Sequence, residues 1–361
     1  MHLASILDIR SIPAAGLYIS LTRRCPLSCA HCSTSSTTQS EEQDGQALLR
    51  FVSTFSEKNR PQILMLTGGE PLLRPGLVKS LTDIAHSVGT MVSLSSSLFF
   101  ASKKRIPETI LDAILAVDHI ITSLDTFHER EISRSDLLAI VSQIVALGKD
   151  VSFHVVGNGP NDPYLSDVVD DIRQTFKDNV PIIVGDIQPV GRAADWMTRS
   201  GVSNVIGLPE PTPCTLAAWP VVAFDGSVVL CCNQDAIDGP TPDHLKLGDV
   251  RGDAWEAIRA RHISRGFHQA LRVFGPQYLS ARFKEASYAC QGYCETCRTL
   301  SNDVDVSARI DEFGARPTMS LIQDHVVEAL RKEPLQGVVP KYAYLAYLGA
   351  PLEQKGDTLC E

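Results

Sequence analysis

Short apolar runs alternate with longer amphipathic segments over the first half of the chain, which is the pattern of β-α units built around a parallel sheet. The runs that we expect to be strands are Leu17–Thr22, Gln62–Thr67, Met91–Ser95, His119–Leu124, Val151–Val156 and Pro181–Gln188. The segments that we expect to be helices are about Glu41–Ser56, Pro75–Val88, Pro107–Val117, Glu129–Leu147 and Pro163–Phe176. Six such units favour an α/β fold with a partial (β/α)6 barrel of the TIM type, whose site would lie at the carboxyl ends of the strands. A doubly wound open sheet is the alternative architecture.

The pattern changes near Gly201, where proline, glycine and short alternating runs become frequent. Two such runs, Pro220–Phe224 and Ser227–Cys231, flank the pair Asp225-Gly226, which predicts a β-hairpin. We therefore expect a barrel domain over residues 1–200, a small hairpin-containing domain over 201–300, and a tail over 301–361 with one helix at Ser320–Lys332. The tail also holds tyrosines that either pack in the core or shape a substrate entrance, namely Tyr342, Tyr344 and Tyr347.

Composition narrows the class of protein. The chain has 361 residues, 44% of them hydrophobic, and a net charge of −9, which argues against binding to nucleic-acid phosphates through a basic surface. A small molecule or a peptide is the expected partner. No run approaches the about 18 apolar residues of a membrane span, and Asp8 and Arg10 interrupt the N-terminal stretch, so we expect neither a membrane segment nor a secretory signal. In the cytosol, the expected compartment, the ten cysteines point to metal or redox chemistry and not to disulfides.

Three cysteines lie close together directly after the first predicted strand, in Cys25-Pro-Leu-Ser-Cys29-Ala-His-Cys32. They can bind one metal centre, but they are one ligand short of the four that close a structural zinc site. A four-iron cluster with three cysteine ligands instead keeps one iron open. The alternatives are a zinc site completed by His31 and unliganded cysteines that pack in the core.

Most of the remaining cysteines fall in the second region. Eleven residues separate Cys214 from Gly226 and four more precede Cys231, so the hairpin turn would bring Cys231 back toward Cys214. Successive strand residues point to opposite faces, which makes Cys232 a packing residue if Cys231 is a ligand. A later set would share one face of a helix, and consists of Cys290, Cys294 and Cys297. A structural zinc with four cysteine ligands is an alternative here, and Cys360 is expected to be a free terminal cysteine.

The spacing C-x3-C-x2-C after the first strand, followed by Gly68-Gly69-Glu70-Pro71 after the second, resembles the radical S-adenosylmethionine (SAM) superfamily. The resemblance implies that Cys25, Cys29 and Cys32 hold a [4Fe–4S] cluster whose open iron is chelated by SAM. It also implies that the loop Gly68–Pro71, with Gly68, Gly69, Glu70 and Pro71, receives the SAM amino group. Glycines allow a ligand to approach the backbone closely, and Glu70 offers acceptors to an amine.

Further segments resemble the same superfamily. Ser123-Leu124-Asp125 resembles its Ser-x-Asp segment, which implies that Ser123 reaches the SAM ribose; a strand end that caps the next helix is the alternative. At the third strand, Ser95 and Ser97 depart from the Thr-Asn-Gly of many relatives.

Two more residues are candidates for the mouth of the barrel. His154 ends the fifth strand and contacts SAM or substrate, or is a satisfied core histidine. The segment Gln188–Arg192 resembles the loop after the sixth strand in relatives with a C-terminal cluster domain, where Arg192 would face the substrate or remain a surface residue.

The second cysteine group resembles the auxiliary-cluster domains called SPASM, in the shortened form called Twitch that occurs in aminocyclitol-dehydrogenase-type members. That resemblance implies one auxiliary [4Fe–4S] cluster and makes residues 201–300 a small iron–sulfur domain. The ligands would be Cys214, Cys231, Cys294 and Cys297, with Cys290 and Cys232 as alternates.

Taken together, the resemblance implies cleavage of SAM to a 5′-deoxyadenosyl radical, fed by a flavodoxin- or ferredoxin-type electron donor. A closed auxiliary cluster would accept an electron from the substrate radical, which favours oxidation of a hydroxyl-bearing small molecule such as a sugar or an aminocyclitol. The candidate bases are Asp125, Glu129, Asp186 and Arg192.

Other functions remain open at this point. Oxidative cross-linking of a ribosomally made peptide is the first alternative, although a cluster motif that begins at residue 25 leaves no room for the N-terminal peptide-recognition domain of many such relatives. Oxidation to formylglycine is less favoured, because those relatives carry more cysteines. A non-catalytic iron–sulfur or zinc scaffold would not need Gly68-Gly69-Glu70-Pro71 at a strand end.

Overall fold

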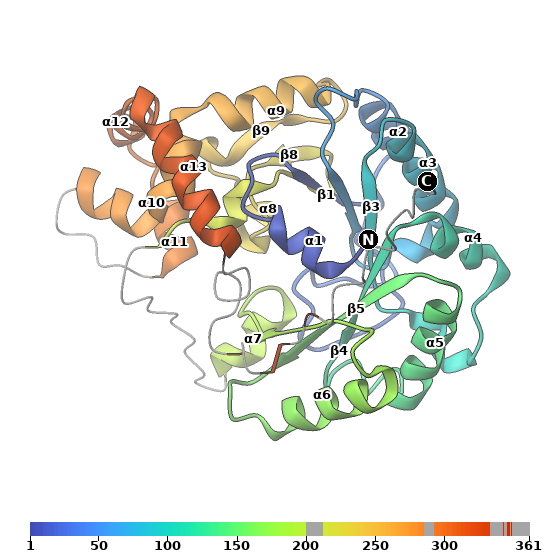
Figure 1. Cartoon of the computed structure of the whole chain (residues 1–361). Coiled ribbons are helices and arrows are strands. Elements are labelled where there is room, and N and C mark those ends of the chain that lie inside the picture. Colours follow the sequence, from blue (N-terminus) through green and yellow to red (C-terminus); the bar gives the residue numbers. More distant parts are fainter. Residues whose placement is uncertain (200–211, 285–291, 333–341, 343–344, 347, 349–361) are drawn as a thin grey trace, which may run out of the picture.

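The computed structural model describes residues 1–199, 212–284, 292–332, 342, 345, 346 and 348 (Figure 1). Within these residues one sheet forms the centre of the molecule, with the strand order β6-β5-β4-β3-β2-β1-β7-β8-β9. The strands are β1 Gly16–Ser20, β2 Ile63–Thr67, β3 Met91–Ser96, β4 His119–Leu124, β5 Asp150–Gly157, β6 Ile182–Asp186, β7 Val221–Val222, β8 Ser227–Val229 and β9 Lys246–Asp249.

Strands β1 to β6 are parallel, and each new strand adds on the same side of the one before it. This order confirms the partial barrel and excludes a doubly wound sheet, in which the direction of growth reverses beside the first strand. Among the described residues β6 and β9 are the edge strands, so the barrel is open. On its other side β1 pairs with β7, so that the sheet continues across the predicted boundary at residue 200. The domain limits therefore stay a prediction.

The helices predicted between the strands are all present, and Figure 1 shows them on the outside of the curved sheet. Two begin later than expected because a side chain caps them: Asp44 accepts from Gln46 N at 2.9 Å, and Ser133 accepts from Asp136 N at 3.2 Å. The helices are α2 Gly45–Val52, α3 Pro75–Ser87, α4 Glu108–Ala116, α5 Arg134–Ala146 and α6 Pro163–Phe176.

A short N-terminal helix, α1 (Leu3–Asp8), lies inside the curve of the sheet (Figure 1). Its apolar residues share a buried cluster with Ile63, Met65 and Trp219. Because Ile63 is the first residue of β2, α1 covers the amino ends of the strands. The carboxyl ends remain for the functional site.

After β6 the chain is more helical than the sequence indicated. The predicted hairpin is confirmed, since β7 and β8 are antiparallel and Gly226 adopts a positive φ of 89° at the turn. The helix expected at Ser320–Lys332 is confirmed within α13, but the described part of the tail also contains α12, which was not expected. The helices of this half are α7 Arg192–Arg199, α8 Gln234–Asp238, α9 Trp255–Ser264, α10 Gly266–Phe283, α11 Tyr293–Arg298, α12 Val304–Gly314 and α13 Pro317–Lys332.

The packing of α10 explains why α12 was missed. A Cβ atom at Gly314 would lie 1.8 Å from the carbonyl oxygen of Gly266, so α10 and α12 cross with their backbones almost in contact. Such a crossing depends on two glycines far apart in sequence. Four short 3-10 segments complete the described secondary structure: Pro71–Leu73, Phe99–Lys103, Thr215–Ala218 and Asp243–Leu245.

Two remaining expectations concern the tail and the membrane. Tyr342 is fully buried, as a core contact would be, whereas Tyr344 and Tyr347 lie outside the described residues. No helix in the described part of the chain combines the length and the hydropathy that crossing a bilayer requires.

Candidate active site

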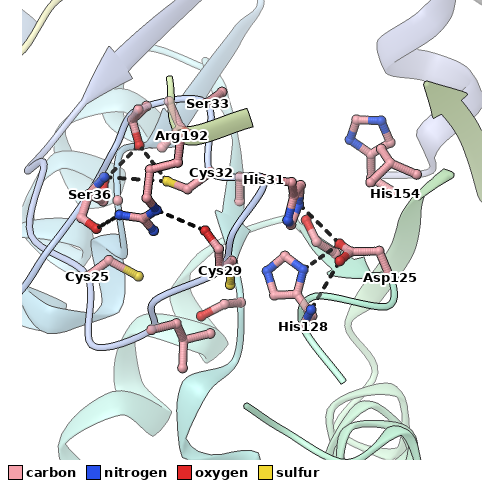
Figure 2. Close-up of a pocket in the computed structure, with 18 of the residues that line it drawn as sticks. Cys25, Cys29, His31, Cys32, Ser33, Ser36, Asp125, His128, His154 and Arg192 are labelled. Atoms are coloured by element: carbon pink, nitrogen blue, oxygen red, sulfur yellow. Dashed lines mark hydrogen bonds and ion pairs between the residues drawn. The ribbon is translucent and has the colours of Figure 1, made fainter. Parts of the chain in front are cut away.

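A cavity of about 310 Å³ opens at the carboxyl ends of β2 to β6. It brings together residues from six separate segments of the chain, among them Gly68, Gly69 and the three cysteines of the first motif, which Figure 2 labels. The predicted site residues that line it are Cys25, Cys29, Cys32, Gly68, Gly69, Ser95, Ser123, Asp125, His154, Asp186 and Arg192.

The three cysteines lie in the loop between β1 and α2, and none of them forms a disulfide. Burial raises the pKa of Cys25 to about 12. Burial acts in the same direction on Cys32, but hydrogen bonds from Thr34 and from the backbone N–H of Ser36 outweigh it, so that the pKa of Cys32 is lowered. Three thiols converging on one cavity suit a soft metal centre with an open position.

The loop after β2 brings its backbone against the cysteine loop. Gly68 has a φ of 152°, and a Cβ there would lie 2.3 Å from the carbonyl oxygen of Thr22. At Gly69 a Cβ would lie 2.5 Å from the carbonyl oxygens of Arg23 and Arg24. Only glycine allows this approach, so both residues are required by the close contact of the two loops.

Glu70 does not face the cavity, although the resemblance implied that it would receive the SAM amino group. Its side chain is fully buried behind the cavity and is not part of the lining. Its carboxylate accepts hydrogen bonds from Leu72 N at 3.0 Å, Ser96 Oγ at 2.9 Å, Ser97 N at 2.9 Å and Ser97 Oγ at 2.6 Å. Burial raises the pKa of Glu70, and these four donors oppose that effect. In this structure Glu70 thus holds the end of β3 against the Gly-Gly-Glu-Pro loop, and Pro71 is buried beside it.

The ends of β3, β4 and β5 carry polar side chains into the cavity. Ser95 lines it from β3, and Ser123 lies opposite His154 in the register of β4 and β5. The described residues offer His154 no hydrogen-bond partner, and its side chain is exposed at the cavity. His154 is therefore available to a ligand.

A cluster of Asp125, His31 and His128 forms one wall of the cavity (Figure 2). The buried carboxylate of Asp125 lies 2.5 Å from His128 Nδ1 and 3.3 Å from His31 Nε2. Burial alone would raise the pKa of Asp125. Its hydrogen bonds to the two histidines have the larger effect, so the net result is a lowered pKa. Asp125 is therefore a weak proton acceptor. The potential ligand atoms of the three residues lie within 4.8 Å of one another, and their hydrogen bonds account for this geometry without a metal ion.

The other candidate bases are also engaged. Glu129 lies outside the cavity lining, where it accepts from Arg134 Nε and Tyr164 Oη, both at 2.7 Å. Asp186 lines the cavity and accepts a hydrogen bond from the Tyr342 hydroxyl.

Arg192 binds the cysteine loop, although the sequence suggested a substrate-facing residue. Its Nε donates to the carbonyl of Cys29 at 3.0 Å and its Nη1 to that of Ser36 at 2.5 Å. Its backbone N–H donates to the carbonyl of Cys32 at 3.0 Å, and Trp196 Nε1 donates to that of Ala30 at 3.0 Å. The start of α7 thus fixes the path of the cysteine loop from the far side of the barrel.

We expect Arg192→Met to loosen this loop, because two carbonyl groups lose donors that each contribute about 1 kcal/mol. After anaerobic reconstitution, the variant should release iron to a chelator several-fold faster than the wild type. Arg50→Met, at an exposed position on α2, is the control. Equal release rates in all three proteins would contradict an anchoring role for Arg192.

The second cysteine group also converges. Cys214, Cys231, Cys294 and Cys297 line one small pocket between the hairpin and α11. Cys232 is exposed, and Cys290 lies outside the described residues. Burial raises the pKa of all four lining thiols, that of Cys294 to about 11. Four thiols around one pocket fit a closed metal centre, either a four-iron cluster or zinc.

The comparisons with known proteins agree with the first site. Residues 19–172 match the Radical SAM superfamily.

Individual relatives differ in how much of the chain they match. YydG of Bacillus subtilis (strain 168), named for peptide biosynthesis, is 23% identical over 80% of this chain and 92% of its own length. The PqqA peptide cyclase of Ruegeria pomeroyi is 37% identical, but over only 32% of this chain and 30% of its own length. SuiB of Streptococcus suis bound to S-adenosylmethionine has the same fold, with a TM-score of 0.50 and 11% identity over 73% of this chain and 71% of its own.

Proposed function

We propose that Cys25, Cys29 and Cys32 hold the [4Fe–4S] cluster and that the cavity beside them receives SAM. The observation that carries this proposal is the convergence of the three cysteines, Gly68 and Gly69 on one cavity at the carboxyl ends of the strands. When bound, the cluster and SAM supply a 5′-deoxyadenosyl radical, which abstracts a hydrogen atom from a substrate C–H bond.

The protein's own residues then have distinct tasks. The Gly68-Gly69 backbone and the hydroxyl groups of Ser95 and Ser123 offer polar contacts to SAM, and His154 contacts SAM or the substrate from β5. Arg192 holds the cysteine loop in place, and Glu70 holds the end of β3.

We propose a peptide as the substrate. What supports this choice is the match to YydG, which extends over 80% of the chain and therefore includes the second half as well as the radical SAM domain. Oxidation of a hydroxyl-bearing small molecule, such as a sugar or an aminocyclitol, is the second candidate. The hydroxyl-rich lining of the cavity favours it, with Ser33, Thr34, Ser36, Thr67, Ser95, Ser96, Ser97 and Ser123.

For the second cysteine group we propose an auxiliary [4Fe–4S] cluster that accepts one electron from the substrate radical. Its ligands would be Cys214, Cys231, Cys294 and Cys297, which line one pocket. An external flavodoxin- or ferredoxin-type protein would exchange electrons with the enzyme. A scaffold without catalysis is less well supported, because it gives no reason for two glycines to bring a loop against the cysteine motif.

The test is an anaerobic assay of the reconstituted protein with SAM and dithionite. We expect 5′-deoxyadenosine, measured by liquid chromatography and mass spectrometry. Deuterated peptides and deuterated sugars or aminocyclitols are then supplied in parallel, and the substrate is the class that transfers deuterium to 5′-deoxyadenosine. Transfer from the small molecules alone would replace the peptide by the second candidate. Absence of 5′-deoxyadenosine under all conditions would contradict radical chemistry in this cavity.

A further inference from the structure

Residues of the tail reach the open side of the barrel. Tyr342 is fully buried, and its hydroxyl group donates a hydrogen bond to the carboxylate of Asp186, the last residue of strand β6. The carbonyl group of Tyr342 accepts hydrogen bonds from the backbone N–H groups of Leu345 and Ala346, both at 2.9 Å, so Tyr342 begins a tight turn. These contacts attach the described tail residues to a strand that lies 156 positions earlier in the chain.

Apolar side chains hold this turn against the rest of the protein. The ring of Tyr342 belongs to the main hydrophobic core, and Leu345 packs against that core. Leu348 packs against the separate cluster that α1 forms inside the curve of the sheet. The ring of Tyr342 is therefore fixed by packing, and its hydroxyl group is held at the end of β6.

Asp186 lines the cavity at a distance from the cysteine motif. Figure 2 shows Cys25 and the other two cysteines of the motif at one end of the cavity and His154 at the other. A Cβ atom at Gly185 would lie 3.7 Å from Nε2 of His154, so Asp186, the next residue of β6, lines the cavity at the His154 end. The proposed function places SAM beside the cysteines, which leaves this end to the substrate.

The carboxylate of Asp186 offers hydrogen-bond acceptors to the cavity. A carboxylate has about four acceptor positions, and the Tyr342 hydroxyl group uses one of them. Because the donor is fixed by packing, this hydrogen bond restricts rotation of the half-buried Asp186 side chain. The lone pairs of the carboxylate therefore keep one direction, as a group that binds a substrate in a single orientation requires.

We propose that Tyr342 is a positioning residue for the substrate: its hydroxyl group orients the carboxylate of Asp186, which accepts a hydrogen bond from a substrate group near the C–H bond that reacts. This inference rests on the proposed function. The substrate group is then a hydrogen-bond donor, namely a backbone N–H group in a peptide or a hydroxyl group in a sugar or an aminocyclitol. A tail residue outside the segment that matches the Radical SAM superfamily thus helps to select the C–H bond that meets the 5′-deoxyadenosyl radical.

The test is Tyr342→Phe in the full-length reconstituted protein, which removes the hydroxyl group and keeps the buried ring. The probe is the deuterated peptide, sugar or aminocyclitol that transfers deuterium to 5′-deoxyadenosine in the wild-type assay. We expect the KM of SAM, and the formation of 5′-deoxyadenosine without the probe, to equal those of the wild type. The deuterium transferred per 5′-deoxyadenosine formed should fall by about tenfold, as loss of one orienting hydrogen bond corresponds to, and the KM of the probe should rise.

Tyr164→Phe is the matched control. The Tyr164 hydroxyl group also donates to a carboxylate, that of Glu129 at 2.7 Å, but both residues lie outside the cavity lining. This variant loses the same kind of hydrogen bond and should transfer deuterium as the wild type does. Asp186→Asn tests whether Tyr342 acts through Asp186. If it does, adding Tyr342→Phe to Asp186→Asn should cause no further loss of deuterium transfer.

The outcomes separate this inference from the proposed function. Normal deuterium transfer by Tyr342→Phe, beside an active wild type, would overturn the role of Tyr342 and leave the radical chemistry intact. Equal losses in Tyr342→Phe and Tyr164→Phe would also overturn it, because a structural contact alone would then explain both. Absence of 5′-deoxyadenosine in the wild type would overturn the proposed function, and this inference with it.

Hydrogen exchange of the wild-type protein, followed by mass spectrometry, tests the attachment of the tail even if Tyr342→Phe does not fold. We expect slow exchange at the amides of Leu345 and Ala346, since both donate to the carbonyl group of Tyr342. Exchange as fast as in an unfolded peptide would show that Tyr342 is not held beside Asp186 and would overturn the inference.

Discussion

Simultaneous replacement of Cys25, Cys29 and Cys32 by alanine is expected to reduce formation of 5′-deoxyadenosine from SAM to the level of a protein-free control. The three thiols line one cavity, and removing them deletes every cysteine ligand of the proposed SAM-binding cluster. The measurement is product formation after anaerobic reconstitution, with SAM and dithionite.

The matched control is Cys232→Ala, which removes an exposed cysteine outside both pockets. It should leave the yield of 5′-deoxyadenosine unchanged. Residual SAM cleavage well above background in the triple variant, with a normal circular dichroism spectrum, would show that the radical is generated elsewhere.

A second large effect is expected from Glu70→Gln. The carboxylate of Glu70 accepts four hydrogen bonds, and an amide group would point N–H bonds at two of those donors. Since a hydrogen bond to a buried charged group contributes about 1.5 to 3 kcal/mol, we expect the free energy of unfolding to fall by about 3 kcal/mol. SAM cleavage should fall as well, because Ser96 and Ser97 line the cavity.

Urea unfolding monitored by circular dichroism gives the first quantity, and the 5′-deoxyadenosine assay gives the second. Glu57→Gln, at an exposed position, should change neither. A Glu70→Gln protein as stable and as active as the wild type would contradict the role assigned to Glu70.

The sequence was sufficient for features that depend on local pattern. All six parallel strands lie within two residues of their expected bounds, because buried strands have short apolar runs bounded by polar residues. The grouping of the cysteines followed from spacing and from the Asp225-Gly226 turn, and the structure places each group around one pocket.

Contacts between distant residues could not be predicted in the same way. Arg192 meets Cys29 across 163 positions of the sequence, and nothing in the local pattern around Arg192 indicates that its donors face carbonyl groups. Glu70 was expected to face a ligand because it belongs to the Gly-Gly-Glu-Pro motif. The sequence did not indicate that Ser96 and Ser97, at the end of β3, donate hydrogen bonds to its carboxylate. The sequence could have pointed to His31 and His128 as partners of Asp125 by their positions alone. His31 lies within the cysteine motif, and His128 follows Asp125 by three residues.

Helix α13 was expected at Ser320–Lys332, but the other helices of the second half were missed for a related reason. Helix α10 contains Gly275 with a φ of 72° and Pro276, both of which argue against a helix locally. Packing against α12 and the second cysteine group overrides those preferences.

The central claim is that this protein carries two iron–sulfur centres, one at each cysteine group. Iron and sulfide content after anaerobic reconstitution tests it most directly. The account predicts about eight irons per chain in the wild type and about four in the Cys25, Cys29 and Cys32 triple alanine variant, as two four-iron clusters require. About four irons in the wild type and none in the variant, with zinc present in both, would contradict it and make the second cysteine group a structural site.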